Sequence, residues 1–109
     1  MIRIIHKCDL ESILVPPRSG FLLKLAGVPE SWKECEWLLN QQPGAVCVFG
    51  IGAEVVTHHI DQIIAARGGM NVVTTCHDDE PFDEALWEFE NVYVPLNCES
   101  KSGYVIDLG

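Results

Sequence analysis

The chain has 109 residues, of which 48% are hydrophobic and 21% charged, and this composition is typical of one globular domain spanning residues 1–109. Its formal net charge of −9 disfavours nucleic acid as a partner, because phosphate binding needs a basic surface. No apolar run approaches the roughly 20 residues of a membrane-spanning helix, and no secretory signal is recognisable, so we expect a cytoplasmic protein without a membrane partner.

The cysteine content agrees with a cytoplasmic setting. The number of cysteines is odd and no Cys-x-x-Cys pair is present, so neither a disulfide framework nor a zinc ribbon is indicated. We expect most of the five to be buried thiols that behave as small hydrophobic side chains. They are Cys8, Cys35, Cys47, Cys76 and Cys98.

The first strand-then-helix unit that the sequence predicts clearly begins with an apolar strand at Phe21–Ala26. A helix should begin near Ser31, because Ser31-x-x-Glu34 has the spacing of a capping box, in which the hydroxyl accepts a hydrogen bond from a free backbone N–H. Apolar side chains then recur at helical spacing as far as Leu39, and the Pro-Gly pair at 43–44 should end the element.

Two further units follow the same order. Ala45–Phe49 is an unbroken apolar run, typical of a strand buried on both faces, and a helix is predicted over Ala53–Arg67. Met70–Cys76 is rich in β-branched residues and predicts a third strand, after which Pro81 suits the first turn of a helix. The buried stripe of that helix should comprise Phe82, Ala85, Leu86 and Phe89.

The two ends of the chain are predicted to add edge strands. Val92–Val94 and Tyr104–Leu108 read as closing strands, and the nine residues between them are too few for a helical crossover, so an antiparallel pair is expected. Ile2–Ile5 could form another edge strand, whereas the Pro-Pro pair at 16–17 excludes regular structure there.

This alternation of strands and helices predicts an α/β fold. The expected architecture is a Rossmann-like three-layer sandwich, with a mostly parallel sheet of four to six strands and three helices. Ligands in such folds bind beyond the carboxyl ends of the strands. Three loops qualify by this rule: residues 50–54, 77–81 and 95–98.

Gly50-x-Gly52 matches the first half of a dinucleotide-binding fingerprint. Val55 stands where the third glycine would be, and Glu54 places a negative charge where a phosphate would lie. The pattern therefore favours a tight turn that uses glycine for backbone freedom, and we expect no cofactor.

The negative charge is concentrated in the last third of the chain. Residues 69–109 contain one basic and nine acidic residues, and residues 78–90 contain seven acids and no base. Metal or acid/base chemistry would draw on Glu54, His77, Asp78 and Asp79. The alternative is structural, because Asp79 or Glu80 could instead cap the following helix.

Trp37 and Trp87 each fall off the apolar stripe of their own helix. Partly exposed tryptophans beside carboxylates resemble the anchors of protein interfaces, although at least one of the two is expected to pack against the rest of the fold.

Together these patterns favour a non-catalytic protein-interaction domain over an enzyme. It would bind a basic protein partner, for example as an immunity-like or antitoxin-like inhibitor of a basic enzyme. The expected partner-binding residues are Asp78, Asp79, Asp83, Glu84, Trp87 and Glu88. The alternative is a metal-dependent enzyme or ligand-binding domain with its site at the carboxyl ends of the strands. The sequence carries no signal for an oligomeric state.

Overall fold

The computed structural model describes residues 2–108. The side chains of Lys7, Cys8 and Glu11 lie outside the described part, and so does the burial predicted for Cys8. The elements in chain order are β1 (Ile2–His6), η1 (Lys7–Ser12), β2 (Gly20–Leu25), α1 (Lys33–Asn40), β3 (Ala45–Gly50), α2 (Ala53–Ala66), β4 (Val73–His77), α3 (Phe82–Glu88), η2 (Phe89–Tyr93), α4 (Val94–Asn97) and β5 (Gly103–Asp107).

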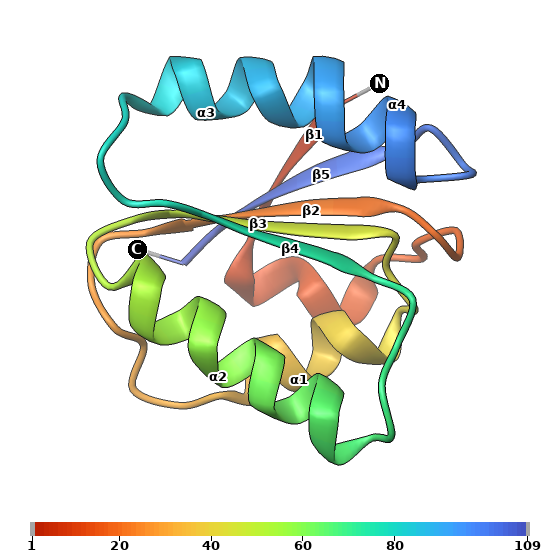
Figure 1. Ribbon diagram of the computed structural model, residues 1–109, viewed down its shortest axis with the longest axis horizontal. Helices are drawn as coiled ribbons and strands as arrows, with labels where there is room; N and C mark the ends of the chain where they lie inside the picture. The colour runs from red at the N-terminus through yellow and green to blue at the C-terminus, as the bar shows by residue number, and fades with distance from the viewer. Residues whose placement is uncertain (1, 109) are drawn as a thin grey trace.

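All five strands form one parallel sheet in the order β1-β5-β2-β3-β4. Helices α1 and α2 cover one face of this sheet, and α3 and α4 cover the other (Figure 1). Since α3, η2 and α4 follow one another without a break, the three predicted helices correspond to α1, α2 and this composite segment. The predicted α/β three-layer fold is therefore confirmed.

The handedness of strand crossovers explains which face each helix covers. From β1 through β2 and β3 to β4 the chain moves across the sheet in one direction, and then it returns from β4 to β5. Because parallel crossovers are right-handed, reversing the direction places the connecting helix on the opposite face. The connections after β3 and β4 therefore diverge to opposite faces, which makes this pair of strand ends a topological switch point, where ligands bind in such folds.

Strand alternation divides the hydrophobic core between the two faces. Phe21 and Leu23 of β2 pack with α1 and α2, whereas Leu22 between them joins Phe89 and Val94 on the other face. These side chains are almost completely buried. The longest helix is α2, with 14 residues, and no helix within residues 2–108 is long and apolar enough to cross a membrane.

The start of α1 differs from the predicted capping box. The N-cap residue is Trp32, not Ser31, and its ring stacks on His59 of α2 at 3.9 Å between centroids. The Ser31 hydroxyl accepts only a long 3.5 Å hydrogen bond from the Lys33 N–H, and Oε2 of Glu34 is buried without a hydrogen-bond partner. The tertiary contact of Trp32 with α2 thus overrides the local capping signal.

The prediction of a strand at Val92–Val94 was wrong, and so was the antiparallel closing pair. These residues are helical, and β5 runs parallel to both β1 and β2. The Val94 N–H bonds to the carbonyl of Phe89 in a π-helical turn, a widening that relieves the clash between the Pro95 ring and the carbonyl of Asn91. Residues 95–97 consequently lie within α4, and the end of this helix with Cys98 approaches the amino ends of β2 and β3 near Gly20 and Gly44, far from the predicted loop cluster.

Candidate functional site

One row of side chains crosses the sheet at the carboxyl end of its strands. Lateral pairing places His6, Asp107, Lys24, Phe49 and His77 opposite one another in that order. Residues paired laterally in a parallel sheet point to the same face, and here that face is the one covered by α3, because Phe49 packs with Phe82 at 5.1 Å between ring centroids. His77 therefore ends the row at the switch point between β3 and β4.

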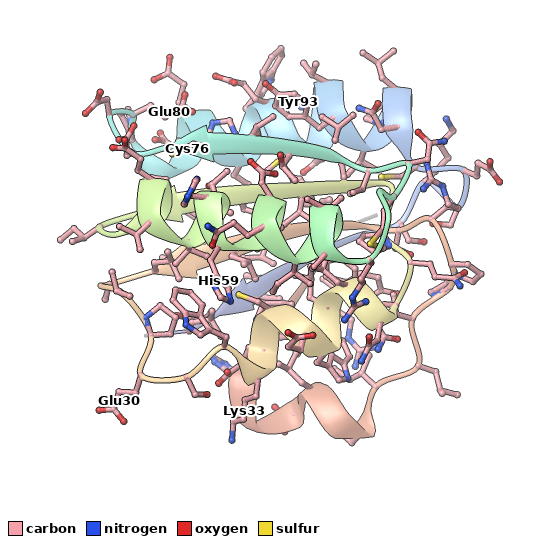
Figure 2. The ribbon with its side chains drawn as sticks, turned by 60° about the horizontal axis from the view of Figure 1, so that its bottom comes forward. Glu30, Lys33, His59, Cys76, Glu80 and Tyr93 are labelled. Carbon is pink, nitrogen blue, oxygen red and sulfur yellow. The ribbon has the colours of Figure 1, made fainter. Side chains whose placement is uncertain are left out.

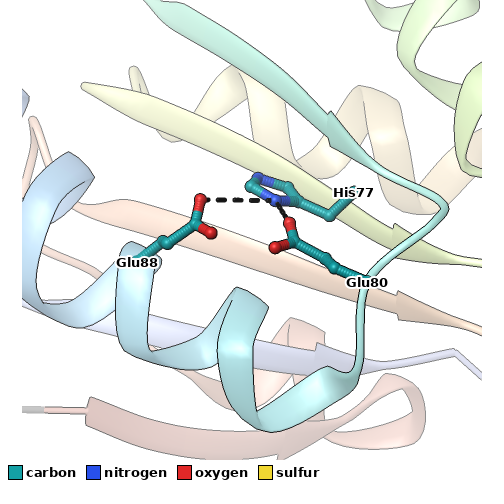
Figure 3. A group of neighbouring side chains, drawn as sticks. All are labelled: His77, Glu80 and Glu88. Atoms are coloured by element: carbon teal, nitrogen blue, oxygen red, sulfur yellow. Dashed lines mark hydrogen bonds and ion pairs between the residues drawn. The ribbon is translucent and has the colours of Figure 1, made fainter.

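His77 lies at the centre of a small polar cluster, and only 5% of its surface is exposed. Its Nδ1 contacts Oε1 of Glu80 directly and lies 3.9 Å from Oε2 of Glu88 (Figure 3). The Thr75 hydroxyl, two residues earlier on the same face of β4, lies 2.7 Å from Nε2. Both ring nitrogens are thus held, and the orientation of the imidazole is fixed.

The two carboxylates of this cluster have opposite pKa shifts. The hydrogen bond with His77 lowers the pKa of Glu80. The pKa of Glu88 is raised, first by its hydrogen bond with Glu80 and then by desolvation and the negative charge of Glu80. Glu88 is therefore the group of the pair that takes up a proton first as the pH falls.

Tyr93 closes the cluster from the α3 side. Its ring meets that of His77 edge to face, with 5.9 Å between centroids, and desolvation followed by the charges of Cys47, Glu88 and Glu80 raises the pKa of its hydroxyl. The π-helical turn contains Tyr93, so the widening before Pro95 also sets where this ring lies.

The four residues predicted as metal ligands are divided between two sides of β4. His77 faces α3, but Glu54 and Asp78 act on the thiol of Cys76, whose pKa is raised by desolvation and then by both charges. Asp79 is exposed. Figure 2 shows Glu80 and Tyr93 on the α3 side and His59 on the side of α1 and α2. Within residues 2–108 the cluster that brings three such groups within 4.8 Å of one another is His77, Glu80 and Glu88.

The residues predicted to bind a partner lie along one loop and one helix. Asp78, Asp79, Asp83 and Glu84 are exposed, whereas Glu88 is half-buried because it turns toward His77. Trp87 is 61% exposed, and it lines a shallow depression together with Pro81, Asp83, Glu84 and Glu88. Trp37 instead packs edge to face on Phe21, with 6.1 Å between ring centroids.

The Gly50-x-Gly52 turn has a backbone explanation. Both glycines have positive φ, at 105° and 90°. A Cβ at Gly50 would lie 2.2 Å from the carbonyl oxygen of Leu25, and one at Gly52 would lie 2.9 Å from the backbone nitrogen of Val28. The turn packs against the segment after β2, and its glycines serve that close approach.

His77 was among the metal ligands predicted from the sequence, whereas Glu80 was offered as a possible helix cap and Glu88 was placed on the partner-binding face. Neither Thr75 nor Tyr93 was singled out from the sequence. The spacing of His77 and Glu80 across a strand-to-helix turn is a usable signal, because a turn of this length returns the chain over the strand end. Glu88 joins them only through the packing of α3 on the sheet, which the sequence does not display.

Comparison with known families places most of the chain in one domain. Residues 28–109, about three quarters of the chain, match the family described as "Domain of unknown function (DUF7684)". The matched residues include β4, α3 and the whole His77 cluster. No curated protein and no solved structure matches the chain.

Proposed function

This chain belongs to the DUF7684 domain family, and we propose that it is a protein-interaction domain that binds a basic protein partner. The binding surface, named the acidic face here, consists of Asp78, Asp79, Asp83, Glu84, Trp87 and Glu88. The observation that carries the proposal is the 61% exposure of Trp87 near the end of α3, among the carboxylates of this helix.

An exposed tryptophan surrounded by carboxylates has the composition of an interface anchor with a polar rim. Burying the indole against a partner removes a large apolar area from water, and such anchors dominate the binding energy of many interfaces. The depression around Trp87 gives a partner side chain a place to lie beside the ring.

The surrounding charge favours a basic partner. Among the ion pairs of the described residues, none joins Asp78, Asp79, Asp83 or Glu84 to a Lys or Arg of the same chain. Charges of one sign on one face raise the association rate for a partner of opposite charge and disfavour acidic ones. Inhibition of a basic enzyme in the cytoplasm, in the manner of an immunity protein or antitoxin, is one form of such binding.

Affinity capture from the source cell, followed by surface plasmon resonance with the captured basic protein, tests the proposal. Neutralising Asp78, Asp79, Asp83 and Glu84 together should slow association at low salt, and Trp87→Ala should accelerate dissociation. Loss of one anchor of this kind costs about 2 kcal/mol or more, which is roughly a thirtyfold weaker Kd.

A matched control neutralises four exposed acids elsewhere, namely Asp9, Glu30, Asp61 and Glu99. This variant has the same net charge as the first and should keep the affinity of the wild type. Equal association rates and affinities for all three proteins at low salt would rule out the acidic face.

A further inference from the structure

The His77 cluster combines three side chains that commonly coordinate metal ions. One ligand atom from each of His77, Glu80 and Glu88 lies within 4.8 Å of the others. The three come from different parts of the switch point, namely the end of β4, the following turn and the last turn of α3. We propose that these residues bind one divalent transition-metal ion of the Zn²⁺ or Mn²⁺ class.

The hydrogen bonds behind the imidazole suit a metal ligand. Nδ1 carries a proton when it donates to Glu80, and a metal ion would take the place of that proton. Nε2–H would then donate to the Thr75 hydroxyl, 2.7 Å away, and the lone pair of Nδ1 would face the two carboxylates. The Thr75 side chain also hydrogen-bonds with Cys47, which gives its own O–H a place to donate. Metal-bound histidines usually donate their second ring N–H in this way, and the bond fixes both tautomer and ring orientation.

The charge of the cluster favours a cation. In that tautomer the imidazole is neutral and the two carboxylates carry two negative charges, and no Lys or Arg among the described residues forms an ion pair with either of them. His77 is buried, with 4% of its side chain exposed, so these charges are only partly screened by water. A divalent ion between the three ligand atoms would balance them.

The ligand set selects the class of ion. Mg²⁺ and Ca²⁺ prefer coordination by oxygen alone, whereas one imidazole nitrogen with two carboxylates suits Zn²⁺, Mn²⁺ or Fe²⁺. Glu80 and Glu88 keep 22% and 33% of their side-chain surface exposed, so solvent reaches the cluster from their side. Three protein ligands would leave the remaining coordination positions to water.

Isothermal titration calorimetry of chelator-treated protein with Zn²⁺, Mn²⁺ and Mg²⁺ tests the site. We expect one Zn²⁺ or Mn²⁺ per chain and weaker binding of Mg²⁺. Glu80→Gln and Glu88→Gln should each weaken Zn²⁺ binding tenfold or more, and Thr75→Val should weaken it by about ten- to a hundredfold through the orientation of His77.

Glu84→Gln is the matched control, because Glu84 lies one helical turn before Glu88 and outside the cluster. It should bind Zn²⁺ like the wild type, and so should Cys76→Ser, which removes the exposed thiol on the other side of β4. Circular dichroism confirms that each variant is folded. The proposal fails if neither Zn²⁺ nor Mn²⁺ binds, if Mg²⁺ binds more tightly, if both cluster variants retain wild-type affinity, or if Glu84→Gln or Cys76→Ser abolishes binding.

Discussion

Glu88 and Glu80 are chemically identical side chains, yet their environments move their pKa values apart. Glu80 receives a hydrogen bond from His77, which stabilises its ionised form. The hydrogen bond of Glu88 with Glu80, followed by desolvation and the charge of Glu80, favours the protonated form of Glu88. Glu88 therefore takes up a proton at a higher pH than Glu80 does, although the two side chains lie side by side.

The raised pKa of Glu88 predicts that the Glu88→Gln variant is more stable than the wild type at pH 7. A carboxyl whose folded-state pKa is raised adds stability below its unfolded value, near 4.5, and loses it as the pH rises through the folded value. At pH 7 in chelator, ionised Glu88 therefore repels Glu80, and a neutral amide that donates to Glu80 should raise Tm. The gain should shrink as the pH falls toward 4.5, where the wild type carries the proton itself.

Thermal unfolding followed by circular dichroism at several pH values measures this difference, with Glu84→Gln as the reference for a simple change of net charge. A Tm for Glu88→Gln below that of the wild type at pH 7 would contradict the assignment. Glu80 should show the opposite pH dependence, because its pKa is lowered. The stability that ionised Glu80 adds to the fold is lost as the pH falls through its folded-state pKa.

At the scale of secondary-structure elements, two apolar residues can test whether the segment from α3 to α4 is helical throughout. Val94 is 4% exposed and Leu96 is 77% exposed. Residues two apart share a face in a strand but lie on nearly opposite sides of a helix. Val94→Ala should therefore cost about 2 kcal/mol of unfolding free energy, and Leu96→Ala should stay within about 0.5 kcal/mol of the wild type.

Urea denaturation of both variants gives these values. Two comparable losses would mean that residues 92–96 are extended, in keeping with the strand predicted at Val92–Val94, and that the continuous helical segment is wrong.

The elements that the sequence predicts well are those in which local preference and burial agree. Ala45–Phe49 is apolar throughout and is a central strand, and the predicted helix Ala53–Arg67 differs from α2 by one residue. At Val92–Val94, local preference and burial conflict. The two valines favour a strand, but the residues lie in a helical segment whose buried side covers β2. The same helix brings Glu88 to His77, so the misassigned segment and the missed cluster have one origin, the tertiary packing of α3 on the sheet.

For the whole molecule, two lengths matter: its dimensions and the distance over which its charges act in salt solution. The chain measures 32 × 30 × 25 Å and carries a net charge of −9. The Debye length is about 30 Å at 0.01 M salt and about 8 Å at 0.15 M. At low salt each charge therefore acts across the entire molecule, and at physiological salt it acts only on its near neighbours.

We therefore expect Tm to rise as NaCl is increased from about 0.01 M to about 0.15 M, because screening weakens the mutual repulsion of the acids. The rise should be smaller for the variant in which Asp83 and Glu84 are neutralised than for one in which Glu30 and Glu99 are neutralised. Both variants lose two charges, but seven acids crowd residues 78–90, whereas Glu30 and Glu99 have fewer acidic neighbours in the sequence. Differential scanning calorimetry at the two salt concentrations measures the slopes, and equal slopes for the two variants would show that the repulsion belongs to the net charge and not to the acidic face.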